Sequence, residues 1–170
     1  MLALAACSNP DVFEGTELTS RNPAPPFELR NQVGHLVGLS DFEGRVVLVT
    51  FLYTHCPDVC PITTSQIRDA YHTLADSADD LAFVVISVDP ERDSVDEAWA
   101  YSVRWQMTSS WDFLVGSREA LSRIWESYYV DPALDVSGRD ALTRHAEVGK
   151  STGVDRLRED ISDRYLVIHS

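Results

Sequence analysis

An apolar, β-branched run that leads into two cysteines constrains the fold of this chain more than any other stretch. Residues 46–53 (VVLVTFLY) have the composition of a strand that is buried on both faces. Cys56 and Cys60 follow, and each is succeeded by a proline. Pro61 predicts that a helix begins there, because proline is preferred at the first helical position. The N–H groups and the dipole of a helix N-terminus favour the thiolate form of a cysteine that lies between a strand and a helix. The alternative is that Cys56 and Cys60 are simply two small buried residues that lie close together in the sequence.

Strands and helices are expected to alternate along most of the chain. Ser94 followed three residues later by Glu97 is a capping-box pattern that predicts a helix start. The other predicted elements are a hairpin of strands 27–29 and 34–39, strands 81–88 and 111–115, and a helix over 117–128. This order predicts an α/β domain with a mixed sheet flanked by helices. A cysteine pair at its first strand-to-helix junction indicates a thioredoxin-like fold.

The composition fits one globular domain and disfavours two classes of partner. The chain has 170 residues, of which 44% are hydrophobic, and its formal net charge is -13. Nucleic-acid binding is not expected because there is no basic footprint, and anionic membrane surfaces are disfavoured for the same reason. No segment reaches the roughly 18 consecutive apolar residues of a membrane-spanning helix.

Residues 1–26 are predicted to be a remnant lipoprotein signal followed by a flexible tether. Residues 4–7 (LAAC) resemble the lipobox of bacterial lipoprotein signals, in which Cys7 would carry the lipid; a chance LAAC is the alternative. The basic region that normally begins such signals is missing, so the natural start is expected upstream. The proline-rich segment 8–26 would then tether the domain to a membrane, in the bacterial cell envelope and facing the periplasm.

The remaining residues, 27–170, are predicted to form one domain with an irregular insertion. Residues 130–164 are charged, punctuated by glycines and without a clear period, which predicts an insertion with partial helix. Residues 165–169 (YLVIH) have the pattern of a strand that is just beginning. We therefore expect the chain to be truncated at its C-terminus.

Three motifs along the chain resemble those of the SCO/SenC family, copper-binding proteins of thioredoxin-like fold that serve cytochrome c oxidase assembly. The motifs are YTHCPDVCP at 53–61, SVDPERD at 87–93 and YLVIHS at 165–170. The resemblance implies that Cys56, Cys60 and His169 ligate copper, as Cu(I) or Cu(II). Thiolate selects Cu(I), whereas a structural zinc site usually has four ligands. His145, inside the predicted insertion, is the alternative histidine.

Asp89 and Asp93 fit two different roles. The family resemblance implies that this pair acts near the copper loop, in partner contact or metal handling. Aspartate before a proline is also a common turn residue, and Asp93 could help to begin the next helix. Both interpretations remain open at this point. Asp58, between the cysteines, could tune the charge of the loop or cap the helix.

The resemblance implies a metallochaperone that delivers copper to the copper-site subunit of cytochrome c oxidase, or to another acceptor, by ligand exchange. The alternative is an enzyme, a thiol–disulfide reductase whose redox-active pair Cys56 and Cys60 keeps the acceptor's copper-site cysteines reduced. A peroxidase of the peroxiredoxin kind is disfavoured because no arginine lies near Cys56 in the sequence.

Overall fold

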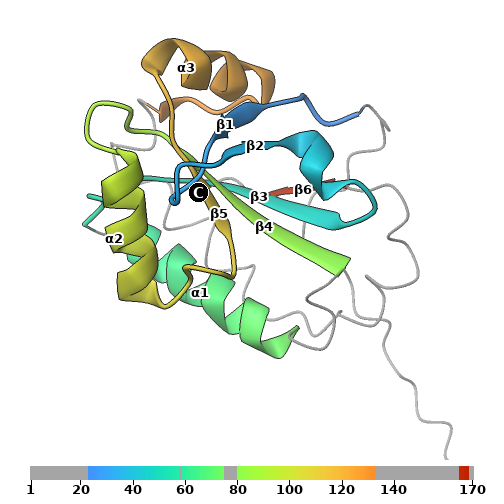
Figure 1. Cartoon of the computed structure of the whole chain (residues 1–170), viewed down its shortest axis with the longest axis vertical. Helices are drawn as coiled ribbons and strands as arrows, with labels where there is room; N and C mark the ends of the chain where they lie inside the picture. Colours follow the sequence, from blue (N-terminus) through green and yellow to red (C-terminus); the bar gives the residue numbers. More distant parts are fainter. Residues whose placement is uncertain (1–22, 58, 75–79, 133–164, 169–170) are drawn as a thin grey trace, which may run out of the picture.

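A four-stranded parallel sheet forms the centre of the fold (Figure 1). The computed structural model describes residues 23–57, 59–74, 80–132 and 165–168. The sheet has the order β5-β4-β3-β6, with bounds Val46–Leu52 for β3, Leu81–Ser87 for β4, Asp112–Leu114 for β5 and Tyr165–Ile168 for β6. Because each neighbouring pair runs parallel, the carboxyl ends of β3 and β4 meet at one edge. The loops that leave this edge carry the motifs of interest.

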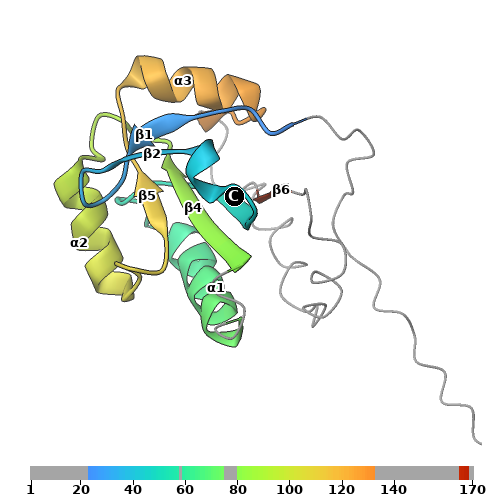
Figure 2. The ribbon, with the colours of Figure 1, turned by 45° about the vertical axis from the view of Figure 1, so that its right-hand side comes forward.

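Helices cover both faces of the sheet (Figure 2). Their bounds are Val59–Thr73 for α1, Val95–Trp105 for α2 and Arg118–Ser127 for α3. In β3, Val47 and Phe51 join the core beneath α3, whereas Leu52 joins the core beneath α1 and α2. Burial on both faces explains why this strand reads as an almost continuous apolar run. The two crossovers, through α1 and α2, confirm the predicted α/β architecture.

The predicted N-terminal hairpin is present beside the main sheet. Strands β1 (Glu28–Arg30) and β2 (Leu36–Gly38) pair antiparallel. Their connection contains Gly34 at φ 81°, a left-handed backbone conformation that glycine adopts without strain. Arg30 forms an antiparallel bridge with Val115, just after β5, and this bridge attaches the hairpin to the sheet edge. A 3-10 turn, η1 (Leu39–Phe42), then leads into β3.

The helix starts decide where the functional side chains lie. As predicted, Ser94 caps α2, with its hydroxyl accepting a hydrogen bond from the Glu97 N–H at 3.2 Å. The predicted start of α1 at Pro61 is wrong by two residues, because α1 begins at Val59. Proline lacks a backbone N–H, but the N–H groups of a first turn have no intrahelical acceptor, so Pro61 is tolerated inside that turn. Cys60 therefore lies within the helix itself.

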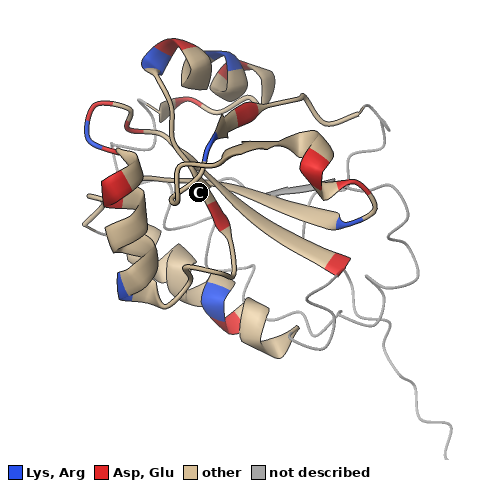
Figure 3. Ribbon diagram, in the orientation of Figure 1, with Lys and Arg blue, Asp and Glu red and all other residues tan. Residues whose placement is uncertain are grey.

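Charged residues lie on the helices, loops and strand ends, and the middle of the sheet carries none (Figure 3). None of the helices in the described part of the chain is long and apolar enough to cross a membrane. Cys7, the predicted tether up to residue 22 and residues 133–164 of the predicted insertion lie outside the described residues. The predictions for these segments therefore remain predictions.

Candidate functional site

The two cysteines lie at the junction between β3 and α1, as expected. Cys56 is in the loop and Cys60 is in the first turn of α1, and both are buried, with 9% and 2% of their surface exposed. The backbone N–H of Cys60 donates a hydrogen bond to the sulfur of Cys56 at 3.3 Å. A helix N-terminus carries partial positive charge, and an N–H aimed at sulfur favours the thiolate form. The junction therefore brings both cysteines to the start of α1, with a backbone N–H directed at the Cys56 sulfur.

Two tyrosines, Tyr53 and Tyr101, lie close enough to the cysteines to interact with them. Burial, a hydrogen bond to Cys56 and the negative charge of the two cysteines together raise the pKa of Tyr53 to about 12, against the lowering effect of Arg92. Burial and the charge of both cysteines also raise the pKa of Tyr101 to about 12, although a hydrogen bond with Thr64 opposes this shift. Both phenols therefore stay protonated at neutral pH. They act as hydrogen-bond donors and apolar walls rather than as bases.

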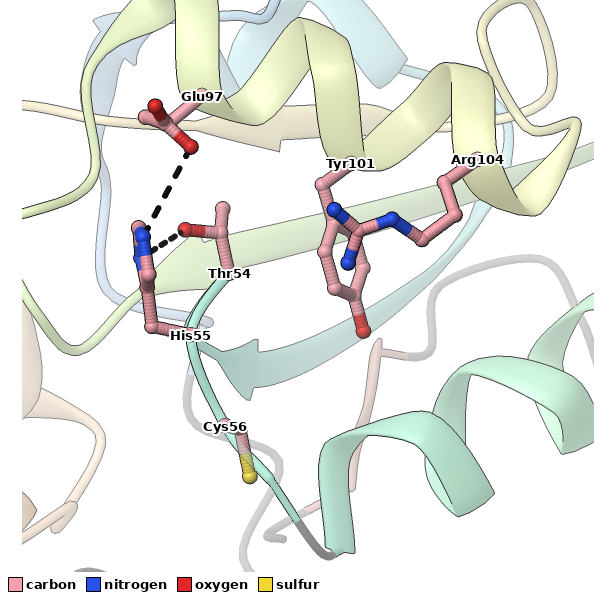
Figure 4. A pocket seen from close by; sticks show the side chains of 6 residues that line it. All are labelled: Thr54, His55, Cys56, Glu97, Tyr101 and Arg104. Atoms are coloured by element: carbon pink, nitrogen blue, oxygen red, sulfur yellow. Dashed lines mark hydrogen bonds and ion pairs between the residues drawn. The ribbon is translucent and has the colours of Figure 1, made fainter.

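A pocket of about 210 Å³ opens beside Cys56 (Figure 4). It is lined by Thr54, His55, Cys56, Glu97, Tyr101 and Arg104. The His55 ring points away from the Cys56 sulfur; its Nδ1 lies 2.8 Å from the Thr54 hydroxyl and its Nε2 lies 3.9 Å from a Glu97 carboxylate oxygen. His55 therefore takes part in local hydrogen bonding with Thr54. Arg104, which is distant from Cys56 in the sequence, reaches the pocket from α2.

Asp93 is buried at the carboxyl end of the sheet, with 5% of its surface exposed. Its carboxylate accepts hydrogen bonds from the Thr54 N–H at 3.1 Å, the Thr54 hydroxyl at 2.6 Å and the Ser87 hydroxyl at 2.5 Å. Burial raises the pKa of Asp93, and these hydrogen bonds partly oppose that shift. The alternative that Asp93 begins α2 is wrong, because Ser94 occupies the capping position.

Asp89 has the turn geometry expected of an aspartate before proline. Its carbonyl accepts hydrogen bonds from the backbone N–H groups of Arg92 at 3.2 Å and Asp93 at 2.9 Å. Its carboxylate pairs with the Arg92 guanidinium, which lies 5.7 Å from the centre of the Tyr53 ring. The Asp89 carboxylate therefore faces the cysteine site through Arg92 and Tyr53, and the Asp89 N–H donates to the Ser87 hydroxyl at 3.0 Å.

The remaining predicted site residues stay predictions. His169, its alternative His145 and Asp58 lie outside the described residues. Strand β6 ends at Ile168, which pairs with Thr50 of β3. Among the residues that the structure describes, no group of three histidine, cysteine, aspartate or glutamate side chains is arranged to hold a metal ion.

Comparison with known proteins identifies the family. The family model for SCO1/SenC matches residues 16–148, which include the cysteine loop and both aspartates. The chain belongs to the SCO1/SenC family. It has the thioredoxin-like α/β fold of that family, as its sequence predicted.

Three solved structures illustrate the similarity to SCO1/SenC members. Copper-bound ScoI of Bradyrhizobium japonicum is 31% identical, with a TM-score of 0.59 over 64% of this chain and 68% of that one. A SCO1/SenC family lipoprotein from Bacillus anthracis is 29% identical, with a TM-score of 0.57 over 62% and 64%. BsSco, described as a cytochrome c oxidase assembly protein with a disulfide switch, is 31% identical, with a TM-score of 0.54 over 62% and 60%.

The match covers only part of the longer relatives. The aligned region spans 48% of the curated SCO1 homolog from Bacillus subtilis and 44% of the human one. The matched region has the same fold as the solved relatives. Because the rest of each relative is not matched, the function of this chain is inferred from its own site.

Sequence reasoning missed several residues that shape this SCO1/SenC site. Ser87 is the last residue of the buried strand β4, and Thr54 lies two residues after the end of β3. A polar residue at such a position is a signal that could have identified both as site residues. Tyr101 and Arg104 carry no local signal, because α2 reaches Cys56 only through the fold of the crossover. Asp93 was a candidate, but its burial could not be derived from a charged residue in a loop motif.

Proposed function

We propose that this SCO1/SenC chain binds copper through Cys56, Cys60 and His169 and delivers it to the copper-site subunit of cytochrome c oxidase. The observation that carries the proposal is the pair of buried sulfurs at the start of α1, with the Cys60 N–H donated to the Cys56 sulfur. Soft thiolates in a buried site suit Cu(I). The copper-bound ScoI structure and the oxidase-assembly role given for BsSco support the cargo and the destination.

In this proposal copper is cargo and passes by ligand exchange. Binding requires the two thiols to lose their protons, and the helix N-terminus lowers the cost of that step at Cys56. A thiolate of the acceptor then replaces each cysteine in turn. The copper remains coordinated throughout, and each departing cysteine can take up a proton from solvent.

The topology supports His169 as the third ligand. The carboxyl ends of β3 and its parallel neighbour β6 lie at the same sheet edge, and the loop to Cys56 leaves from that edge. Residue 169 directly follows β6. We therefore propose the histidine that follows β6 as the third ligand, whereas His145 has no comparable argument in its favour.

Copper titration of the reduced chain tests this ligand set. Competition with a chromophoric Cu(I) chelator should give one copper per chain, and His169→Ala should weaken binding by roughly 10-fold or more, since even residues that only orient ligands contribute this much. His145→Ala is the matched control and should bind like the wild type. An unchanged affinity in His169→Ala, or a loss in His145→Ala alone, would remove His169 from the site.

The delivery step needs its own experiment. Copper-loaded chain mixed with the soluble copper-site domain of the oxidase subunit should lose its copper to that domain, as native mass spectrometry would record. Retention of the copper with the acceptor thiols fully reduced would refute delivery to this partner.

A second candidate function is thiol–disulfide reduction, which the hydrogen bond to the Cys56 sulfur and the disulfide switch named for BsSco favour. Here the Cys56 thiolate attacks the acceptor's disulfide, and Cys60 resolves the mixed disulfide. The acceptor gains two thiols and this chain is left with a Cys56–Cys60 disulfide. Metal-free chain should then reduce an acceptor disulfide faster than an equal concentration of dithiothreitol, and an equal or lower rate excludes this role.

We also propose that Cys7 carries a lipid that anchors the protein to the bacterial cell envelope, facing the periplasm. The support is the LAAC sequence together with the lipoprotein of the same family from Bacillus anthracis. Expression with a complete signal peptide in cells fed a labelled fatty acid should label the wild type but not Cys7→Ala. Equal labelling of both proteins would refute the anchor.

A further inference from the structure

The buried carboxylate of Asp93 joins two segments that are far apart in the chain. One carboxylate oxygen accepts from both the N–H and the hydroxyl of Thr54, and the other accepts from the hydroxyl of Ser87. Ser87 is the last residue of β4, and Thr54 lies two residues before Cys56. Asp93 thus connects the end of a core strand to the loop that carries the first cysteine.

The place of this connection is significant because strand pairing stops just before it. The β3–β4 ladder ends with Leu52 opposite Ser87, and the Val88 N–H donates to the Leu52 carbonyl at 3.0 Å. Thr54 lies beyond that point, in a turn. Its position relative to the sheet is therefore determined by the Asp93 side chain and no longer by the ladder.

The same contact also orients the next residue. A threonine hydroxyl has one hydrogen, and at 2.6 Å that hydrogen is donated to the Asp93 carboxylate. The hydroxyl must then accept from His55, whose Nδ1 lies 2.8 Å away and so carries the proton. Asp93, Thr54 and His55 form one directed chain of hydrogen bonds that ends beside Cys56.

We propose that Asp93 is a positioning residue that acts through Thr54 to hold Cys56 at the place where its sulfur and that of Cys60 face the same copper ion. This rests on the proposed copper-binding function. It assigns Asp93 neither to the metal nor to a partner surface, since its carboxylate is buried and its hydrogen bonds are made within the protein. Asp89 contributes to this connection only through its backbone, whose N–H donates to the Ser87 hydroxyl at 3.0 Å, whereas its carboxylate pairs with Arg92.

Paired substitutions at Thr54 test the proposal. Thr54→Val has nearly the same shape but lacks the hydroxyl, whereas Thr54→Ser keeps it. Thr54→Val should lower Cu(I) affinity by roughly 10-fold or more, the usual effect of losing a group that orients a ligand. Thr54→Ser should bind nearly as well as the wild type, and Asp93→Ala should lose at least as much affinity as Thr54→Val.

A control variant that is destabilised at a distant position separates an effect on the placement of Cys56 from a general loss of stability. Val84 is fully buried beneath α3, on the opposite face of the sheet, so Val84→Ala should lower the free energy of unfolding and leave copper affinity unchanged. If Val84→Ala loses as much copper affinity as Asp93→Ala, the effect only follows stability and the proposal is wrong. Wild-type affinity in Thr54→Val would overturn it as well.

A measurement without copper distinguishes failure of this proposal from failure of the proposed function. A disulfide needs closely defined geometry, so the equilibrium between the thiol pair and oxidised glutathione reports the relative placement of Cys56 and Cys60. In that reaction two protein thiols become a disulfide and oxidised glutathione becomes two thiols. The equilibrium constant should fall in Thr54→Val and Asp93→Ala but not in Val84→Ala. If no variant binds copper, this comparison still decides whether Asp93 positions Cys56.

Discussion

A hydrogen bond joins α1 and α2 beneath the cysteine site, and removing it tests how these two helices pack. The Tyr101 hydroxyl of α2 lies 2.8 Å from the hydroxyl of Thr64 in α1, and both residues are buried. Tyr101→Phe removes only the hydroxyl. The ring keeps its stacking on Trp111 and its edge contact with Phe113.

The expected cost follows from this geometry. A buried hydrogen bond contributes about 0.5–1.5 kcal/mol, and leaving the partner hydroxyl unsatisfied costs about 1–3 kcal/mol. We therefore expect Tyr101→Phe to lower the free energy of unfolding by about 1–2 kcal/mol. In a domain of this size each kcal/mol corresponds to about 2–4 °C in Tm, so the midpoint should fall by about 2–8 °C.

Chemical and thermal denaturation followed by circular dichroism measure this change. Tyr129→Phe is the matched control, because Tyr129 is 94% exposed and its substitution should stay within about 0.5 kcal/mol of the wild type. Thr64→Val should cost about as much as Tyr101→Phe. The double variant should cost about 1 kcal/mol less than the sum, since both partners are then removed together.

Two results would refute the reasoning. If Tyr101→Phe is as mild as Tyr129→Phe, the hydroxyl pair contributes nothing. If the effects of the Tyr101 and Thr64 substitutions are additive in the double variant, the two hydroxyls do not interact, and α1 and α2 are held by other contacts, such as Arg68 over the Trp105 ring.

Three further predictions concern the site and its supports. Alkylation of reduced native protein should modify Cys56, which is 9% exposed, before Cys60, which is 2% exposed; peptide mass spectrometry showing the opposite order would contradict this. Burial raises the pKa of Asp93 above 3.8, so its contribution to stability is fully present below that value and is lost as the pH rises through its folded-state pKa. Denaturation should accordingly show the wild type gaining stability relative to Asp93→Asn as the pH falls, and parallel curves would refute it. Trp125→Phe removes a buried indole donor to the last carbonyl of β4 and should cost about 1–3 kcal/mol in denaturant unfolding. Trp99→Phe, at a position 44% exposed, should cost less than about 0.5 kcal/mol, and an equal effect of the two would contradict this.

The sequence predicted those parts of the fold that depend on local pattern. β3 could be recognised because both of its faces are buried, and α2 because Ser94 supplies the cap that its first turn needs. The cysteine junction followed from the order of these elements. The first residue of α1 was harder to predict, since proline is compatible with several positions in a first turn. The helix begins at Val59, so Cys60 lies within it.

The composition of the pocket could not be predicted in the same way. Tyr101 and Arg104 meet Cys56 because α2 packs over the end of β3, and no spacing within the sequence encodes that meeting. The argument that no arginine lies near Cys56 was correct for the sequence and did not extend to the fold. Side chains from different crossovers become neighbours only when the sheet order is known.

The burial of Asp93 argues that its contribution concerns placement more than stability. Because burial raises its pKa, the ionised carboxylate is less stable in the folded protein than in water, despite three hydrogen bonds. A buried charged group of this kind is weak evidence for stability, because an apolar or neutral residue often serves that purpose as well. The carboxylate has two strong acceptor oxygens and accepts from three donors at once: the N–H and hydroxyl of Thr54 and the hydroxyl of Ser87. A neutral residue without two such oxygens cannot do this. The carboxylate thereby connects the cysteine loop to the end of β4, just beyond the point where hydrogen bonding between β3 and β4 stops.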